Sequence, residues 1–422
     1  LSNRRQWTGI ERLLAQSFPA ARFEGRIHNV EHHEAHLASA YFVSPFGRAA
    51  VVSVDGFGDF SSCAWGLGEG NRIDVLGRIG FPHSLGIFYE AVAQYLGFEH
   101  YGDEYKVMGL APYGQSSRRR ALDNVLKLHD DGGFELDLRY FTHAQSGANY
   151  QIRDGVPSGG RLFSAALEEL LGPARQPGEA LERRHRDLAR SVQVAYEDAF
   201  FNLLNAVFRQ TGSPALAIAG GCAYNSVANG KIYERSPFMR CYVQSAAGDG
   251  GGAIGAAYAV WHRLEPAAPR FEMSHAYFGP AYGPAAIAAA LSQRQAEVEG
   301  AGCTVTVIDD EAGGCHWGQR AIPRRKVGGW VQGRLEVWAP GLWNRSILAD
   351  PRRTDMKDII NSRIKRRESF RPFAPSVLRR YVADWFETDD DVPFMMQVSQ
   401  VRRDRRATIP AVTHVDGSGR LQ

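Results

Sequence analysis

The sequence is poor in cysteine and has no long apolar run. Its 422 residues include five cysteines, none in a Cys-x-x-Cys pair: Cys63, Cys222, Cys241, Cys303 and Cys315. This is too few for a disulfide-based scaffold and suits a reducing compartment, so we expect a cytoplasmic protein. No stretch of about 18 apolar residues and no charged-then-apolar leader occurs, which predicts neither a membrane span nor a signal peptide.

Lysine is also scarce, and the basic residues are unevenly distributed. The net charge is only +3, which argues against a general nucleic-acid binder. Arginines number 43 and lysines 6, and between Arg324 and Arg380 there are 15 basic residues against 5 acidic ones. This stretch predicts an anion-binding region, and the anion is either a small phosphate-bearing ligand or an RNA backbone. Only Phe370 and Phe373 are available there for base stacking, which favours the small ligand.

Strand-like runs that end in glycine alternate with helix-like segments. Three such runs are Ala49–Val54 before Asp55-Gly-Phe-Gly58, Ala215–Ala219 before Gly220-Gly221, and Cys241–Gln244 before Gly248–Gly255. We expect helices from Leu181 to Gln210 and from Ala256 to Trp261. Backbone N–H groups at strand-to-glycine turns can approach an anion closely, so the pattern predicts a phosphate-handling α/β fold. Residues 266–284, rich in proline, glycine and alanine, are the expected linker.

Three histidines fall within five positions in the stretch VEHHEAHLASAYF, which begins at residue 30. On a helix, His32 and His36 lie on one face, and His33 points elsewhere. The pair is either part of a partly buried polar face or two ligands of one cation. Asp55 and Asp249 each follow a strand-like run, and two imidazoles with two carboxylates suit iron or zinc better than magnesium. A metal site requires both carboxylates to converge on the histidine helix.

Nine blocks, in order along nearly the whole chain, resemble the O-carbamoyltransferases of antibiotic and nodulation-factor biosynthesis. The blocks are HHEAHLASAYF, SVDGFGD, FPHSLGIFYEAVAQYLGF, GDEYKVMGLAPYG, GGCAYNSVANGKI, GDGGGAIGAAY, NRSILADPR, MKDIINSRIKRRESFRPFAPSV and IPAVTHVDG. The family includes tobramycin-, cephamycin- and nodulation-type enzymes. The resemblance implies a two-step reaction. Carbamoyl phosphate and ATP yield carbamoyl-AMP and pyrophosphate, and the carbamoyl group then passes to a hydroxyl of a natural product or glycolipid.

The same resemblance implies an α/β fold with two functional domains. Residues 1–265 would form an actin-like ATPase-type (ASKHA) transfer domain, residues 266–312 a linker and the start of the second domain, and residues 313–422 an incomplete adenylate-forming domain similar to threonylcarbamoyl-AMP synthase. The implied ligands are ATP with Mg²⁺, carbamoyl phosphate, a hydroxyl acceptor and a divalent metal, with Fe²⁺ expected. No nucleic-acid or membrane partner is expected.

The resemblance also assigns individual residues. His32, His36, Asp55 and Asp249 would bind the metal, and Asp55, Glu104 and Lys106 would be catalytic. Gly220, Gly221 and Asn225 would contact the adenosine, and Gly250, Gly251 and Gly252 the phosphate. Arg334, Arg345, Lys357, Arg363, Lys365 and Arg371 would hold carbamoyl phosphate and the triphosphate. The alternatives are tight packing for the glycines, and solvated surface charge for the basic set and for Glu104 and Lys106.

One block departs from the family pattern GRMEFGPRALGNRS and reads GRLEVWAPGLWNRS over residues 333–346. Pro340 replaces an arginine, and Trp338 and Trp343 replace glycines, which a packed loop does not accommodate. We interpret the block as a local frameshift, because deletion of one base in a GC-rich reading restores Glu-Phe-Gly-Pro-Arg-Ala. Residues 313–325 are expected to share this origin. Since we also expect truncation at both ends, the alternative function is an inactive remnant that binds at most nucleotide or metal.

Overall fold

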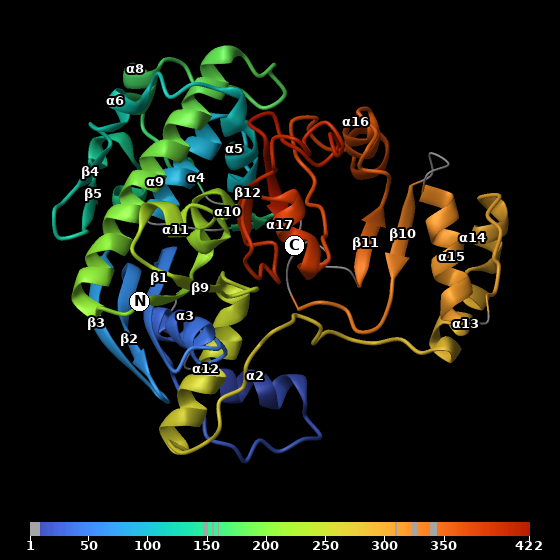
Figure 1. The fold of residues 1–422 in the computed structure, drawn as a ribbon. Helices are drawn as coiled ribbons and strands as arrows, with labels where there is room; N and C mark the ends of the chain where they lie inside the picture. The colour runs from blue at the N-terminus through green and yellow to red at the C-terminus, as the bar shows by residue number, and fades with distance from the viewer. Residues whose placement is uncertain are drawn as a thin grey trace.

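The computed structural model describes residues 9–146, 151–153, 156–158, 160–308, 310–322, 327–337 and 344–422. Trp338, Pro340 and Trp343, the three departures in the block over residues 333–346, lie outside the described residues. The protein is a mixed α/β fold in which one five-stranded sheet organises the first part of the chain, and short elements make up the rest (Figure 1). In the described part of the chain, no helix is both long and apolar enough to cross a membrane.

The main sheet has the strand order β3-β2-β1-β8-β9. Its strands are β1 (Arg48–Gly58), β2 (Ser61–Glu69), β3 (Arg72–Gly80), β8 (Ala215–Ala219) and β9 (Arg240–Val243). The first three pair antiparallel, whereas β8 and β9 join β1 in parallel. The central strand β1 is buried from Ala49 to Val54, as expected of an apolar run covered on both faces. Because parallel strands end at the same edge, Asp55 and Gly220 meet there.

Helices cover both faces of this sheet (Figure 1). One face carries α3 (His32–Tyr41) and α12 (Asp249–Leu264), and the other α4 (Leu85–Tyr95) and α9 (Arg183–Thr211). The prediction of a long helix from Leu181 is confirmed, and it ends at Gly212, whose φ of 57° favours glycine. The prediction that a helix starts at Ala256 is wrong, because α12 starts at Asp249 and the following glycines form its first turn.

Shorter elements complete this part. They are α2 (Ile10–Ser17), α5 (Glu104–Leu110), η1 (Ala111–Tyr113), α6 (Arg119–Leu122), β4 (Leu126–Leu128), β5 (Phe134–Leu136), η2 (Leu138–Tyr140), α7 (His143–Ser146), β6 (Gln151–Arg153), β7 (Val156–Ser158), α8 (Ala165–Leu171), η3 (Gly221–Tyr224), α10 (Ser226–Asn229) and α11 (Ile232–Arg235). The expected linker runs without helix or strand from Glu265 to Gly283, apart from one bridge at Ala281.

The rest of the chain is built from small elements. They are α13 (Pro284–Gln293), α14 (Gln295–Gly300), α15 (Glu311–Ala321), β10 (Gly328–Val331), β11 (Arg345–Leu348), α16 (Met356–Ile359), the π-helical turn η5 (Ile360–Lys365), η6 (Arg379–Tyr381), α17 (Val382–Trp385), β12 (Gln397–Gln400) and β13 (Ser418–Leu421). Helices α13, α14 and α15 bury none of their residues. Phe370 and Phe394–Met396, in contrast, join the main hydrophobic core. The main core therefore includes residues on both sides of the predicted linker. The domain limits themselves stay a prediction.

Candidate functional site

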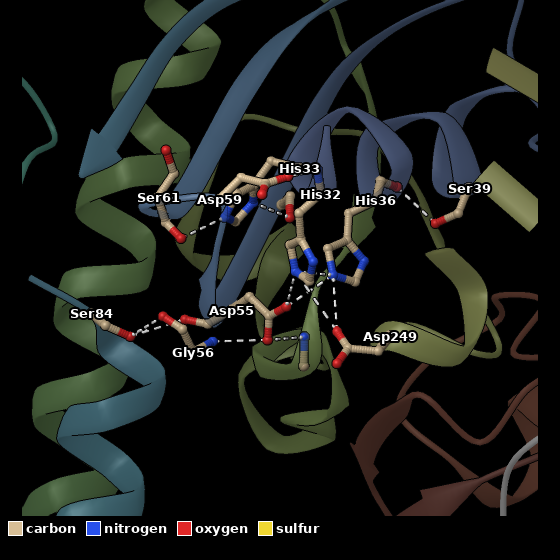
Figure 2. A network of polar contacts seen from close by, with 12 residues as sticks. His32, His33, His36, Ser39, Asp55, Gly56, Asp59, Ser61, Ser84 and Asp249 are labelled. Carbon is tan, nitrogen blue, oxygen red and sulfur yellow. Dashed lines mark hydrogen bonds and ion pairs between the residues drawn. The ribbon is translucent and has the colours of Figure 1, made fainter. Parts of the chain in front are cut away.

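Four side chains from three elements converge at the carboxyl edge of β1 (Figure 2). His32 and His36 come from the first turns of α3, Asp55 from β1, and Asp249 from the first position of α12. One potential ligand atom from each lies within 4.8 Å of all the others. The convergence that a metal site required is therefore present, and we call these four residues the metal cluster.

The distances within the metal cluster fit ligands that share one ion. Oδ2 of Asp55 lies 2.8 Å from Nε2 of His36 and 3.1 Å from Nε2 of His32. The two Nε2 atoms are 3.0 Å apart, and Oδ1 of Asp249 lies 3.5 and 3.7 Å from them. Bonds of about 2.0–2.2 Å to a common ion place neighbouring ligand atoms about 3 Å apart. Nitrogen donors mixed with carboxylates fit iron or zinc.

The charges of the cluster favour a cation. Burial alone would raise the pKa of Asp55, but hydrogen bonds from His32, His36 and the Gly56 N–H hold this pKa well below its usual range. Burial likewise lowers the pKa of His36, but Asp249 and Asp55 outweigh it and raise the value to about 9. Asp55 is therefore ionised, and the negative charge that retains a proton on His36 can equally retain a metal.

Exposure differs among the four residues. The side chain of His36 is 1% exposed, that of His32 24%, and that of Asp249 70%. Nδ1 of His36 is buried and has no hydrogen-bond partner among the described residues, so the strong contacts of this ring run through Nε2. The cluster is closed on the His36 side and open towards Asp249, which leaves room for a further ligand there.

Backbone contacts hold the ligands in place. The N–H groups of Gly56 and Gly221 donate to Oδ1 of Asp55 at 2.8 and 3.0 Å, which leaves Oδ2 free to face the imidazoles. Gly58 lies against the His32 ring so closely that a Cβ there would be 2.0 Å from Cγ of His32. A Cβ at Gly255 would be 1.7 Å from the Ala35 carbonyl oxygen, so only glycine lets α12 approach α3 and deliver Asp249.

His33, the third histidine of the motif, is fully buried outside the cluster. Its Nε2 donates to the Ser61 carbonyl at 2.9 Å, and its Nδ1 accepts from the Ser53 hydroxyl at 2.9 Å. Burial lowers the pKa of His33, which keeps this tautomer neutral. His33 therefore ties α3 to β1 and β2, and it points away from His32 and His36, as expected from its position on the helix.

Glu104 and Lys106 on α5 are not solvated surface charges. Nζ of Lys106 lies 2.8 Å from Oδ1 of Asp103 and 3.2 Å from Oε1 of Glu368 in the second part of the chain. Burial raises the pKa of Glu104, and the neighbouring Asp103 adds to the shift. Lys106 thus joins the two parts of the chain, whereas Glu104 is a mostly buried carboxyl group with a raised pKa.

The residues expected at the adenosine have structural partners. Gly220, at φ 89°, packs on β1, where a Cβ would be 2.2 Å from the Val54 carbonyl oxygen. Oδ1 of Asn225 accepts from the Ala228 N–H at 3.1 Å and caps α10. Gly250, Gly251 and Gly252, which were expected at the phosphate, lie in the first turn of α12, where the helix dipole favours an anion, and the Gly251 N–H donates to the Gly248 carbonyl at 3.0 Å. Their contacts with a nucleotide stay a prediction.

Some of the basic residues predicted to bind phosphate lie near one another in the structure. Lys365 has its pKa lowered by burial and by the charges of Arg367, Arg371 and Arg345. We call these four residues the cationic group; sequence reasoning missed Arg367. Burial, with Arg371 adding to it, lowers the pKa of Arg367 to about 10.

The remaining three predicted basic residues, Arg334, Lys357 and Arg363, are not members of the cationic group. Nζ of Lys357 lies 3.2 Å from the hydroxyl of Tyr113, at the junction between the two parts of the chain. Arg334 and Arg363 are exposed. Of the six predicted residues, Arg345, Lys365 and Arg371 therefore belong to the cationic group.

Comparisons with known proteins place the chain in a family. A profile described as the carbamoyltransferase N-terminus matches residues 12–258, and one described as the carbamoyltransferase C-terminus matches residues 319–422. The chain is 38% identical over 93% of its length to the uncharacterised protein sll1178 of Synechocystis. It is 37% identical over 97% to the nodulation protein NolNO of Sinorhizobium fredii, and 37% identical over 93% to NolO of Bradyrhizobium diazoefficiens.

The matched regions span 65%, 56% and 67% of these three relatives. Among solved structures, the HypF protein of T. kodakarensis is similar over 60% of this chain and 39% of its own, at 16% identity and a TM-score of 0.31, a likeness too slight to bear on the site. The two profiles cover most of the chain in the expected order. The chain therefore belongs to the carbamoyltransferase family.

Proposed function

We propose that the protein is an ATP- and metal-dependent O-carbamoyltransferase. Water releases phosphate from carbamoyl phosphate to leave carbamate, and the carbamate oxygen attacks the α-phosphate of ATP to give carbamoyl-AMP and pyrophosphate. A hydroxyl acceptor then takes the carbamoyl group and releases AMP. The convergence of His32, His36, Asp55 and Asp249 is the observation that carries the proposal. It supplies a cation site with an open side at the edge of the sheet where strand-to-glycine turns meet.

Fe²⁺ is the proposed metal, held by the four cluster residues. When bound, it would supply a positive charge that polarises the carbamoyl carbonyl. The protein's own residues orient and charge the site. Asp55 stays ionised because backbone N–H groups fix one of its oxygens, and Gly58 restrains the His32 ring.

Glu104 is the proposed proton acceptor for the attacking hydroxyl. Its pKa is raised by burial, so its carboxylate is a stronger base than a solvated one. Lys106, on the same helix, is proposed to position α5, because its ammonium group is fixed between Asp103 and Glu368. The acceptor proton would pass to the Glu104 carboxylate as the bond between the acceptor oxygen and the carbamoyl carbon forms.

The cationic group is the proposed site for carbamoyl phosphate and the Mg²⁺-bound triphosphate. Four cations held close together repel each other and gain stability from a phosphate anion, with which arginine forms bidentate contacts. The proposed fold of the transfer part is actin-like, which the strand order β3-β2-β1-β8-β9 with an antiparallel β2 supports. The nucleotide would lie at the first turn of α12 and near Gly221.

Two measurements on the purified chain test the proposal. Metal analysis should find about one equivalent of iron, reduced to background in the His32→Ala/His36→Ala double variant. Pyrophosphate release from ATP should depend on added carbamoyl phosphate and should fall in Arg371→Met. A soluble, metal-loaded preparation that releases no pyrophosphate would identify the alternative, a remnant that retains metal binding without the reaction.

A further inference from the structure

The tip of the β1–β2 hairpin carries the most exposed large apolar side chain among the described residues. This is Phe60, at 86%. Gly58 pairs with Ser61, so the turn consists of Asp59 and Phe60 alone. Both have positive φ, 46° and 66°. Two-residue hairpin turns of this kind favour Asn-Gly, because most side chains are strained at positive φ.

Phe60 is therefore unfavourable for the fold in two ways. Its backbone conformation suits glycine better, and its ring is left in water. Neither feature stabilises the hairpin, and a glycine at this position would relieve both. Strained residues that persist in a structure are concentrated at functional sites, so this outlier points to a ligand.

A second exposed aromatic ring stands beside it. The N–H of Phe81 donates to the carbonyl of Phe60 at 2.8 Å, and the Phe81 side chain is 46% exposed. Phe81 is supported from behind by Phe57, whose ring centroid is 5.1 Å away. Phe57 lies two residues after Asp55 on β1, so the strand that carries the cluster carboxylate also supports Phe81.

The hairpin tip is also attached to the cluster through His32. Oδ2 of Asp59 accepts from the backbone N–H of His32 at 2.9 Å (Figure 2), and Gly58 lies against the His32 ring. His32 is the more exposed of the two cluster histidines. The hairpin tip that carries Phe60, and to which Phe81 is hydrogen-bonded, is thus attached to the more exposed histidine of the cluster.

We infer that Phe60 and Phe81 form the platform that binds the carbamoyl acceptor. This inference rests on the proposed function, since an acceptor must bring its hydroxyl to the cluster. The chemistry of the platform fits an alcohol with an apolar C–H face, such as a saturated sugar ring: the C–H face would lie on the two phenyl rings, and a hydroxyl at the ring edge would point towards the cluster.

Saturation-transfer NMR on the full chain tests the platform, with methyl β-D-glucopyranoside as the probe. The wild type should transfer saturation to the ring protons of the glucoside, and Phe60→Gly should lose most of this signal. The thermal midpoint of Phe60→Gly should nevertheless rise, because glycine accepts the φ of 66°. Loss of binding together with a gain in stability is not expected of a residue with a merely structural role.

Two controls separate the possible failures. Phe278→Ala removes an exposed phenylalanine outside the hairpin, 40% exposed, and should keep the wild-type signal. Carbamoyl-phosphate-dependent pyrophosphate release is measured on the wild type as the second control, because it tests the proposed function without the acceptor. No saturation transfer in the wild type, or full transfer in Phe60→Gly, overturns the platform. Absence of pyrophosphate release in the wild type contradicts the proposed function instead.

Discussion

The metal cluster and the cationic group both bring several charged side chains together, but they differ in the signs of those charges. In the cluster, two carboxylates face two imidazoles, and backbone N–H groups and glycine contacts fix the ligands. In the cationic group, the charges of Arg345, Arg367 and Arg371 add to burial in lowering the pKa of Lys365, and Glu368 lies 3.6 Å from Arg371. The first group brings carboxylates and imidazoles together, as the proposed cation site requires, whereas the second gathers positive charge, as the proposed anion site requires.

The largest expected effect is the loss of metal in His36→Ala. Removal of the most buried ligand should weaken metal binding more than about 100-fold, since even residues that only orient metal ligands contribute about 10- to 100-fold. Competitive chelator titration measures the affinity. His28→Ala, a change at an exposed histidine outside the helix, is the control and should bind as the wild type does. If His36→Ala and the wild type bind metal with equal affinity, the four cluster residues do not form a metal site.

Next in size is the response of the cationic group to an anion. Pyrophosphate should raise the thermal midpoint of the wild type, and Arg371→Met should bind it about 1.5–3 kcal/mol more weakly, the range for a charge-assisted hydrogen bond. Calorimetric titration measures the difference. Arg379→Met is a matched control, because Arg379 is already paired with Asp389 and Asp391. Equal losses in both variants would mean that only general surface charge is sensed.

A smaller effect is expected from Gly58→Ala. The added Cβ would be 2.0 Å from Cγ of His32, so the ring must move, and metal affinity should fall about tenfold. Gly56→Ala is the matched control on the same strand, because a Cβ there meets no atom within 4 Å. If the two alanine variants bind metal equally well, the hairpin does not position His32.

The smallest expected effect concerns Glu104 and depends on pH. Its folded pKa is raised above 4.5, so the folded state holds the proton more tightly, and stability falls as pH rises from 4.5 through the folded pKa. Glu104→Gln should therefore stabilise the protein by about 0.5–1 kcal/mol at pH 7 and by nothing at pH 4. Denaturant unfolding at both pH values measures this. A gain that persists at pH 4 would assign the effect to packing.

Much of the architecture could be predicted from the sequence, because it depends on local pattern. The apolar runs of β1 and β8 and the long helix α9 were recognisable, and the spacing of His32 and His36 placed them on one helix face. The convergence of Asp55 and Asp249 depends on which strands pair, and that information is not local. The tertiary contacts of Gly58, Gly221 and Gly255 were likewise invisible, because a glycine in a sequence does not tell which side chain or backbone it meets.

The cationic group illustrates the same limit. The basic run was evident, but its pattern could not show which of its residues the fold brings together. Arg367 was missed although it is partly buried and its Nε donates to Asn361 at 2.7 Å, whereas Arg363 and Arg334, which were selected, are exposed. The early start of α12 was missed because glycine lowers helix propensity, which close packing of Gly251 and Gly255 overrides here.

The origin of the four cluster residues has a consequence for biosynthesis. His32, His36 and Asp55 are synthesised close together, with His32 and Asp55 only 23 positions apart, but Asp249 follows β8 and β9. A nascent chain on the ribosome can therefore present three of the four ligands long before the fourth exists. In the proposed metal site, full metal retention would require β8 and β9 to join the sheet and α12 to dock on α3, so bound metal would report that this part of the protein has finished folding.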